Sequence, residues 1–278
     1  MLLNTLIDKN PDRRGQILQI VGERLGLSRE RIVAYYHDIA LTSSQVVKIN
    51  KDMSKLKEGT PLPYCIHKKG FYGTNLKVNK NVLIPRYETE ILVETAITLA
   101  DKLKSGNVVD VGTGSGNIII SINKAVGKHL KYFAVDKSSK ALAVAKTNAK
   151  QNKITDIKFY KSDLFSNPRI PRQSDLIVAN LPYLCSDYLL SLPASITRHL
   201  KFEPRMALDG GKDGLKIIRD LIGLLDTRMS SRGTAILEIG DNQRRDVAGL
   251  CRKAGLKIRT IKDLNGFDRF VVIKKRTH

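Results

Sequence analysis

A polar tetrapeptide, Asn180-Leu181-Pro182-Tyr183, follows directly after the apolar run at 176–179. The Asn180 side-chain oxygen and the Leu181 backbone carbonyl can accept the two hydrogens of an amide group. An amide nitrogen is a poor nucleophile because its lone pair is delocalised, and such acceptors would orient it and stabilise the positive charge that develops when it reacts. Pro182 biases residue 181 toward extended backbone, and Tyr183 can pack against a planar group. Taken alone these residues are also typical of a capped turn, so the amide-site hypothesis depends on their place at a strand end.

A glycine-rich segment, Gly112-Thr113-Gly114-Ser115-Gly116, follows the strand-like run at 108–111 and precedes the apolar residues 118–120. Glycines at such a turn let the backbone pass close to a ligand at the carboxyl end of a strand. A dinucleotide fingerprint would have GxGxxG, but position 117 is Asn, so the pattern is GxGxG. This spacing suits the amino-acid half of S-adenosylmethionine, which has no pyrophosphate to bind.

Two further polar positions follow the next two apolar runs. Asp136 ends the run that begins at 132, and a carboxylate there can accept hydrogen bonds from both hydroxyls of a ribose. A helix N-cap is the structural alternative for Asp136. After the run at 157–160, Asp163 can accept a hydrogen bond from the exocyclic amine of adenine, and Leu164 can cover a face of its ring. The glycine-rich segment, Asp136 and the Asp163–Leu164 pair occur in order, one after each successive strand. Together they are more specific for S-adenosylmethionine than any one of them alone.

The elements that must position these residues alternate between strand and helix from about residue 90. Short apolar runs separated by helical stretches occur at 108–109, 132–135, 157–160, 176–179 and 235–239. This alternation predicts an α/β fold with a parallel, doubly wound sheet. The runs at 257–261 and 269–273 predict a hairpin that closes the chain.

The N-terminal residues 1–60 predict a small helical domain instead. Pro11 can open a first helix that Gly26 closes, Ser28 is a fair N-cap for a second, and Thr42 with Gln45 forms a capping-box pattern for a third. The segment 60–64 breaks the helical pattern, and residues 71–83 suit a β-hairpin with its turn near 79–81. We therefore expect a helical domain at 1–60, a β-hairpin linker at 61–89 and a catalytic domain at 90–278.

Composition excludes several classes of protein. The 278 residues include three widely spaced cysteines, which suggest neither a disulfide framework nor a metal site, and we expect no metal. No apolar stretch approaches the ~20 residues of a membrane span, and the N-terminus lacks the features of a signal peptide, so we expect a cytoplasmic protein without membrane contact. The net charge of +21 favours acidic partners and allows a weak contact with RNA or the ribosome. A solvated basic surface explains the charge equally well, because only 6% of residues are aromatic and could stack on bases.

Several motifs in a fixed order carry a resemblance to the HemK/PrmC family of protein N5-glutamine methyltransferases. They are Thr60–Tyr64, Phe71–Gly73, Leu83–Glu90, Asp163–Phe165, Glu203–Leu208, Gly210–Leu215, Leu237–Gly240 with Gln243, and Lys262–Leu264 with Asp268 and Arg269. The resemblance implies a Rossmann-like class I methyltransferase sheet with a small N-terminal helical domain for substrate recognition, joined to it by a β-hairpin.

The same resemblance implies an activity. It is methylation, with S-adenosylmethionine, of the glutamine N5 in the Gly-Gly-Gln loop of class I peptide chain release factors. Asn180 and the Leu181 carbonyl would hold the amide, and Gly112–Gly116, Asp136, Leu164 and Asn180 would line the cofactor pocket. The family usually has Pro where this chain has Leu181, so the acceptor carbonyl is kept but a constraint on φ is lost.

Three alternatives share part of this pattern. The Asn-Leu-Pro-Tyr tetrapeptide also resembles that of ribosomal RNA adenine dimethylases, but those enzymes carry their small domain after the catalytic one. A sister activity on a glutamine of a large-subunit ribosomal protein shares nearly every motif and stays open. A catalytically idle binding protein would require a broken glycine loop or the loss of Asn180, and the sequence has neither.

Overall fold

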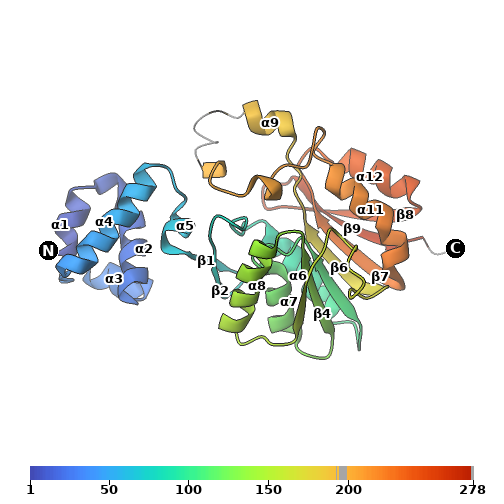
Figure 1. The fold of residues 1–278 in the computed structure, drawn as a ribbon, viewed down its shortest axis with the longest axis horizontal. Coiled ribbons are helices and arrows are strands. Elements are labelled where there is room, and N and C mark those ends of the chain that lie inside the picture. Colours follow the sequence, from blue (N-terminus) through green and yellow to red (C-terminus); the bar gives the residue numbers. More distant parts are fainter. Residues whose placement is uncertain (192, 194–198, 277–278) are drawn as a thin grey trace. The chain divides into compact units, whose positions relative to one another are not determined.

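The computed structural model describes residues 1–191, 193 and 199–276, which form two compact units. Unit 1 contains residues 1–68 and, of the later chain, the described residues 199–202. Unit 2 contains the remaining described residues (Figure 1). Each unit has a hydrophobic core of its own. Within the described ranges, no helix has the length and apolar character needed to cross a bilayer.

Unit 1 is helical, and its local sequence signals explain where the helices begin and end. Gly26 adopts a φ of 66° directly after the helix Arg14–Leu25. The Ser28 side chain accepts a hydrogen bond from the Arg31 amide, and Thr42 forms a capping box with Gln45. The three predicted helices are therefore confirmed. The helices are α1 (Leu3–Asp8), η1 (Pro11–Arg13), α2 (Arg14–Leu25), α3 (Arg29–Tyr35), α4 (Ser43–Lys57) and α5 (Leu62–Ile66).

The short helix α5 corrects the prediction that the segment 60–64 interrupts helical structure. Pro61 is its N-cap and Pro63 lies in its first turn. Proline is tolerated at these positions because the first amides of a helix have no partner within the helix.

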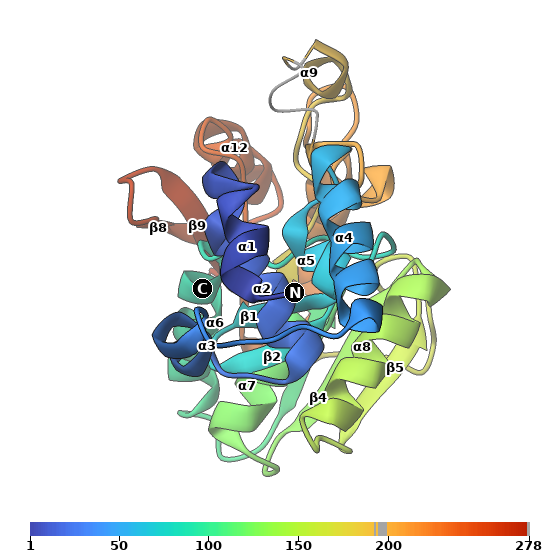
Figure 2. The ribbon, with the colours of Figure 1, turned by 90° about the vertical axis from the view of Figure 1, so that its left-hand side faces the viewer.

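Unit 2 contains a seven-stranded sheet in the order β5-β4-β3-β6-β7-β9-β8. Strands β3 to β7 pair in parallel, whereas β9 is antiparallel to both β7 and β8, so the predicted α/β sheet and closing hairpin are confirmed. Strand β5 forms one edge, beside β4 (Figure 2). The strands are β3 (Asn107–Val111), β4 (Lys131–Asp136), β5 (Ile157–Lys161), β6 (Ser174–Asn180), β7 (Met229–Glu238), β8 (Leu256–Lys262) and β9 (Asp268–Lys275).

Helices cover both faces of this sheet, which is why its central strands read as continuous apolar runs. Val109 and Val111 belong to the core that includes residues of α11 and α12, whereas Val108 belongs to the core that includes residues of α6 and α7. The helices of unit 2 are α6 (Thr89–Ala100), α7 (Asn117–Val126), α8 (Ser139–Gln151), α9 (Ser186–Ser191), η2 (Arg205–Ala207), α11 (Lys216–Arg228) and α12 (Arg244–Lys253).

The predicted hairpin is present, but its turn lies elsewhere. A two-stranded sheet is formed by β1 (Lys68–Phe71) and β2 (Thr74–Lys77), with Tyr72 and Gly73 between them at φ values of 41° and 65°. Two positive φ angles suit a two-residue hairpin turn. At 79–82, near the place where we expected the hairpin turn, the chain forms a separate turn: the Asn79 carbonyl accepts from the Val82 amide at 3.1 Å, and the Asn79 side chain accepts from the Asn81 amide.

Candidate active site

A cavity of about 410 Å³ lies at the carboxyl edge of the sheet in unit 2. The loops that follow β3, β4, β5 and β6 all contribute to it, which is where an open parallel sheet binds ligands. Most of the predicted site residues line it: Gly112, Thr113, Gly114, Ser115, Asp136, Asp163, Leu164, Asn180, Leu181 and Pro182. Gly116 and Tyr183 lie outside its lining.

The glycine loop is held against the neighbouring strand. The amides of Gly112 and Thr113 both donate to the Val135 carbonyl at 2.9 Å. Gly116 is the N-cap of α7, and a Cβ there would lie 2.9 Å from the Ile120 side chain and 3.2 Å from that of Ala145. The absence of a side chain at Gly116 thus permits close packing of helices rather than contact with a ligand.

Asp136 connects the glycine loop to the following helix. Its Oδ2 accepts from the Gly114 amide at 2.9 Å and its Oδ1 from the Ser138 amide at 2.7 Å. Burial raises the pKa of Asp136, and the two backbone hydrogen bonds oppose that shift. The N-cap of α8 is Ser138, whose hydroxyl accepts from the Ala141 amide, so Asp136 does not serve as that cap. Each carboxylate oxygen keeps a second lone pair that can accept from a ligand hydroxyl.

The loop after β5 has a strained backbone at the cavity. Leu164 has a φ of 48°, which a non-glycine residue adopts only when its surroundings impose it. The Ser162 hydroxyl imposes it by donating to the Leu164 carbonyl at 2.7 Å and accepting from the Asn167 amide. Asp163 is 61% exposed and forms an ion pair with Lys137 at 2.6 Å.

Asp110 is a candidate that the sequence interpretation did not single out. It is fully buried in β3, and its Oδ2 accepts from the Thr113 hydroxyl at 2.7 Å. Burial raises the pKa of Asp110 to about 7. Its Oδ1 has no hydrogen-bond partner among the residues that the structure describes. The signal was available, because a carboxylate interrupts an apolar strand two residues before the glycine loop.

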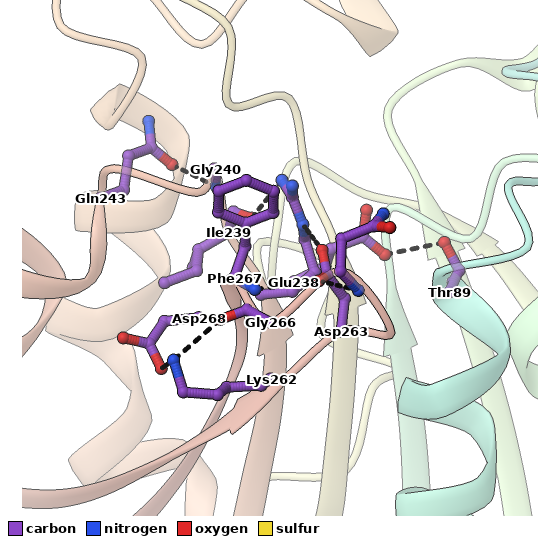
Figure 3. Close-up of polar contacts among 12 residues, drawn as sticks. Thr89, Glu238, Ile239, Gly240, Gln243, Lys262, Asp263, Gly266, Phe267 and Asp268 are labelled. Carbon is purple, nitrogen blue, oxygen red and sulfur yellow. Dashed lines mark hydrogen bonds and ion pairs between the residues drawn. The ribbon is translucent and has the colours of Figure 1, made fainter.

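A chain of hydrogen bonds links the tetrapeptide to two other segments. Asn180 Nδ2 donates to Thr89 Oγ1 at 3.2 Å, and Thr89 Oγ1 donates to Glu238 Oε2 at 2.7 Å. The contact between Thr89 and Glu238 is visible in Figure 3. Burial raises the pKa of Glu238 to about 7. Within the described part of the chain, Asn180 Oδ1 makes no hydrogen bond, so the acceptor of this side chain remains free in the cavity wall.

Tyr183 lies away from the cavity. Its hydroxyl donates to Glu238 Oε1 at 3.3 Å, its ring packs against the hydrophobic core, and burial raises its pKa. Its backbone carbonyl accepts from Gln243 Nε2 at 2.9 Å. Gln243 Oε1 in turn accepts from the Gly240 amide at 2.8 Å (Figure 3). Tyr183 therefore anchors the loop that carries Asn180.

Leu181 and the segment 84–86 complete the cavity wall. The Leu181 side chain is buried against the glycine loop, since a Cβ on Gly112 would lie 2.8 Å from its Cδ2. Glu203 is buried and accepts from Arg86 at 2.6 Å and from the Ile84 amide at 3.1 Å. This charged pair fixes Arg86, which also lines the cavity.

Comparisons with known proteins place these features in a family. A family model described as "Methyltransferase domain" matches residues 102–219. The release factor glutamine methyltransferase of Thermodesulfovibrio yellowstonii is 34% identical over 90% of this chain and 88% of its own length. The chain belongs to the release factor glutamine methyltransferase family. The relative of the same name from Dictyoglomus turgidum is 37% identical over 89% of this chain and 86% of its own length.

Solved structures agree in fold. A methyltransferase from Pyrococcus furiosus superposes with a TM-score of 0.54 at 15% identity, covering 84% of this chain and 98% of that one. A ribosomal protein L11 methylase from Lactobacillus delbrueckii subsp. bulgaricus gives 0.51 at 24% identity, covering 69% and 81%. The predicted family, the Rossmann-like methyltransferase fold, the methyltransferase activity and S-adenosylmethionine as cofactor are thus confirmed.

The residues of the cavity fit S-adenosylmethionine. Asp136 lines the cavity, and its carboxylate oxygens keep lone pairs that can accept from ribose hydroxyls. Val82, Ile118 and Leu164 supply apolar lining for an adenine ring.

Proposed function

We propose that this enzyme methylates the side-chain amide nitrogen (N5) of the glutamine in the Gly-Gly-Gln loop of class I peptide chain release factors. The observation that carries the proposal is the state of Asn180, whose NH2 group is occupied by Thr89 while its oxygen is free in the cavity wall. An acceptor held in this way suits a substrate that presents N–H groups. The names of the relatives support a release factor as the protein that carries this amide.

The chain's own residues would act by binding and orienting the amide. Asn180 Oδ1 and the Leu181 carbonyl accept its two hydrogens, which aims the nitrogen and stabilises its developing positive charge. S-adenosylmethionine, when bound, would supply an electrophilic methyl group on a positively charged sulfur. Asn180 and the Leu181 carbonyl would hold the amide nitrogen toward that methyl group, and the methylated nitrogen would release one proton to water. Histidine does not occur in the cavity lining, and this order of events requires no general base.

We assign the cofactor to Gly112–Gly116, Asp136, Asp163, Leu164 and Asn180, with Gly116 acting through the position of α7. We assign substrate binding to Asn180, Leu181, Pro182 and Tyr183, with Tyr183 acting through its anchoring contacts. The helical part of unit 1 is proposed to recognise the release factor. We also propose that the reaction takes place in the cytoplasm and that the basic surface makes a weak contact with RNA or the ribosome, for which the net charge of +21 is the support.

The test is incubation of the purified enzyme with methyl-labelled S-adenosylmethionine and one acceptor at a time. The acceptors are a release factor, the same factor with its loop glutamine changed to alanine, a large-subunit ribosomal protein and ribosomal RNA. We expect label on the unaltered factor only. Label on the ribosomal protein alone would favour the sister activity, and label on RNA alone would favour adenine methylation.

A further inference from the structure

The Asn180 side chain presents a problem of orientation that its shape does not solve. Its oxygen and its NH2 group are nearly equal in size, so packing alone does not determine which of them faces a ligand. An oxygen toward the substrate accepts its N–H, whereas an NH2 group in the same place sets donor against donor. The amide must therefore be oriented by the chemistry of its partner.

Thr89 orients the Asn180 amide because its hydroxyl has one proton and already donates it to Glu238. Its hydroxyl donates to Glu238 Oε2 at 2.7 Å, and an ionised carboxylate can only accept. The lone pairs of Thr89 Oγ1 are left to accept a hydrogen bond, which only the NH2 group of Asn180 can donate. Both Thr89 and Glu238 are buried, at 0% and 2% exposure, so water does not compete for these contacts.

We propose that Thr89 and Glu238 are positioning residues that fix the oxygen of Asn180 toward the substrate amide. The inference rests on the proposed function, in which that oxygen is the acceptor. Thr89 begins α6 and Glu238 ends β7, so two elements remote in sequence set the orientation of a side chain at the end of β6. Neither residue takes part in the methyl transfer itself.

The surroundings of Glu238 support its acceptor role at pH values above about 7. Tyr183 donates to its other oxygen, the positive charge of Arg269 favours the ionised form, and Glu88 opposes it. Arg269 is itself held by Asp263 at 3.2 Å and by the Ile239 carbonyl at 3.3 Å. The loop between β8 and β9, which contains Asp263, thus stabilises the site indirectly (Figure 3).

The main experiment compares three substitutions in the full chain. Thr89→Val removes the hydroxyl with little change in shape, Thr89→Ser keeps it, and Thr95→Val is the matched control in the same helix, because the Thr95 hydroxyl donates only to the Ile91 carbonyl. We expect Thr89→Val to lower the single-turnover rate of methyl transfer about 10- to 100-fold, the range for a misplaced acceptor, with the KM for the release factor and the cofactor affinity little changed. Thr89→Ser and Thr95→Val should stay near the wild-type rate.

A double substitution separates positioning from a merely structural role. If Thr89 acts through Asn180, then Thr89→Val should slow an Asn180→Ala enzyme no further. Additive losses in the double variant would overturn the inference, as would a Thr89→Val enzyme that transfers methyl groups at the wild-type rate.

Nuclear magnetic resonance tests the orientation without any release factor. The side-chain NH2 signals of Asn180 are identified by their loss in Asn180→Asp. We expect slow solvent exchange of one of these protons in the wild type and in Thr89→Ser, and fast exchange in Thr89→Val. Equal exchange in all three proteins would contradict the inference even if the release factor proved not to be the substrate, so the two failures can be told apart.

The pH profile tests the part played by Glu238. Since burial raises the pKa of Glu238 to about 7, protonation below that pH would let it donate to Thr89 and reverse the direction of the chain. We expect the wild-type rate to fall as the pH drops through about 7. Glu238→Gln should remove this fall, whatever the rate of the variant, because a glutamine side chain takes up no proton in this range. The same fall in Glu238→Gln would show that another group sets it.

Discussion

At the scale of single residues, the proposed chemistry depends on one side chain more than on any other. Asn180→Ala removes an oriented acceptor, and we expect methyl transfer to a release factor to slow by about 10²- to 10³-fold. Affinity for S-adenosylmethionine should change little, because most of the residues assigned to the cofactor lie on the earlier loops, with the glycine loop and Asp136 foremost. Rapid-quench kinetics and calorimetric titration of the cofactor measure the two quantities.

Asn152→Ala is the matched control for that substitution. The Asn152 side chain donates to the Asn148 carbonyl at the end of α8 and lies outside the cavity lining. If Asn180→Ala lost cofactor binding together with activity while Asn152→Ala retained both, Asn180 would have a mainly cofactor-holding role.

The raised pKa of Glu238 also predicts how the free energy of unfolding changes with pH. Burial raises its pKa from 4.5 to about 7, so between these values the folded protein holds a proton that the unfolded chain has released. The contribution of Glu238 to the free energy of unfolding must therefore decrease as the pH rises from about 5 to 8, by on the order of 1–3 kcal/mol. Chemical denaturation across this range should show the decrease in the wild type and a smaller one in Glu238→Gln. Parallel curves for the two proteins would contradict the assigned burial effect.

The site residues that could be predicted from the sequence lie at strand ends, whereas those that were missed depend on contacts between distant segments. Gly112, Asp136 and Asn180 each follow directly from the end of a strand, so the strand pattern locates them. Thr89 and Glu238 matter because they contact each other across 149 positions of sequence, and no local pattern encodes that pairing. Reading a single sequence gives the ends of strands but not the partners that folding brings to them.

At the scale of elements, local chemistry predicted helices better than turns. The capping box at Thr42 and Gln45 is complete within four residues, which is why α4 could be placed from sequence. The hairpin turn was misplaced because Tyr72 is not a typical turn residue, whereas Asn79 and Asn81 are. Here the pairing of β1 with β2 imposed positive φ on a residue that rarely adopts it.

The loop at 210–214 gives a prediction at this scale because it packs against the loop that carries Asn180, at the backbone of Tyr183. Gly214 has a φ of 71°, and a Cβ there would collide with the Tyr183 carbonyl and lie 2.8 Å from Gln243 Nε2. We expect Gly214→Ala to reduce the free energy of unfolding by about 2–4 kcal/mol and to slow methyl transfer, since the strain displaces the anchor of the tetrapeptide.

Gly223→Ala provides the contrast within the same unit. Gly223 lies inside α11, and a Cβ there meets nothing within 4 Å. Alanine should therefore stabilise the helix by about 0.5–1 kcal/mol without a change in rate. Denaturation midpoints and methyl-transfer rates of the two variants check the pair, and equal effects would show that the 210–214 loop does not support the site.

At the scale of the whole molecule, the division into two units corresponds to two proposed roles, cofactor binding and recognition of the protein substrate. All of the residues found to line the cavity belong to unit 2, so we expect cofactor binding to require no residue of unit 1. Unit 1 has its own core, built around Ile17, Ile20 and Ile49, and a smaller cavity of about 210 Å³ beside Asn10 and Met53. This separation supports the proposal that unit 1 recognises the protein substrate.

A substitution that destabilises unit 1 alone would test that proposal in the full chain. Asp52 is 2% exposed, and Arg24 binds it at 2.6 Å while Lys55 lies 4.0 Å away. Arg24→Met leaves a buried carboxylate with only the more distant cation, which should destabilise unit 1 by up to about 3–5 kcal/mol. Glu23→Gln is the matched control, because its partner Lys68 is substantially exposed and such pairs contribute less than about 1 kcal/mol.

We expect hydrogen exchange to show faster opening of unit 1 in Arg24→Met while unit 2 keeps its protection and its affinity for S-adenosylmethionine. The KM for a whole release factor should rise, because local opening removes the surface that recognises it, whereas the rate with a short Gly-Gly-Gln peptide should stay the same. Glu23→Gln should resemble the wild type in every measurement. If Arg24→Met methylated the whole factor as well as the wild type despite faster opening, substrate recognition would have to reside in unit 2, beside the cavity itself.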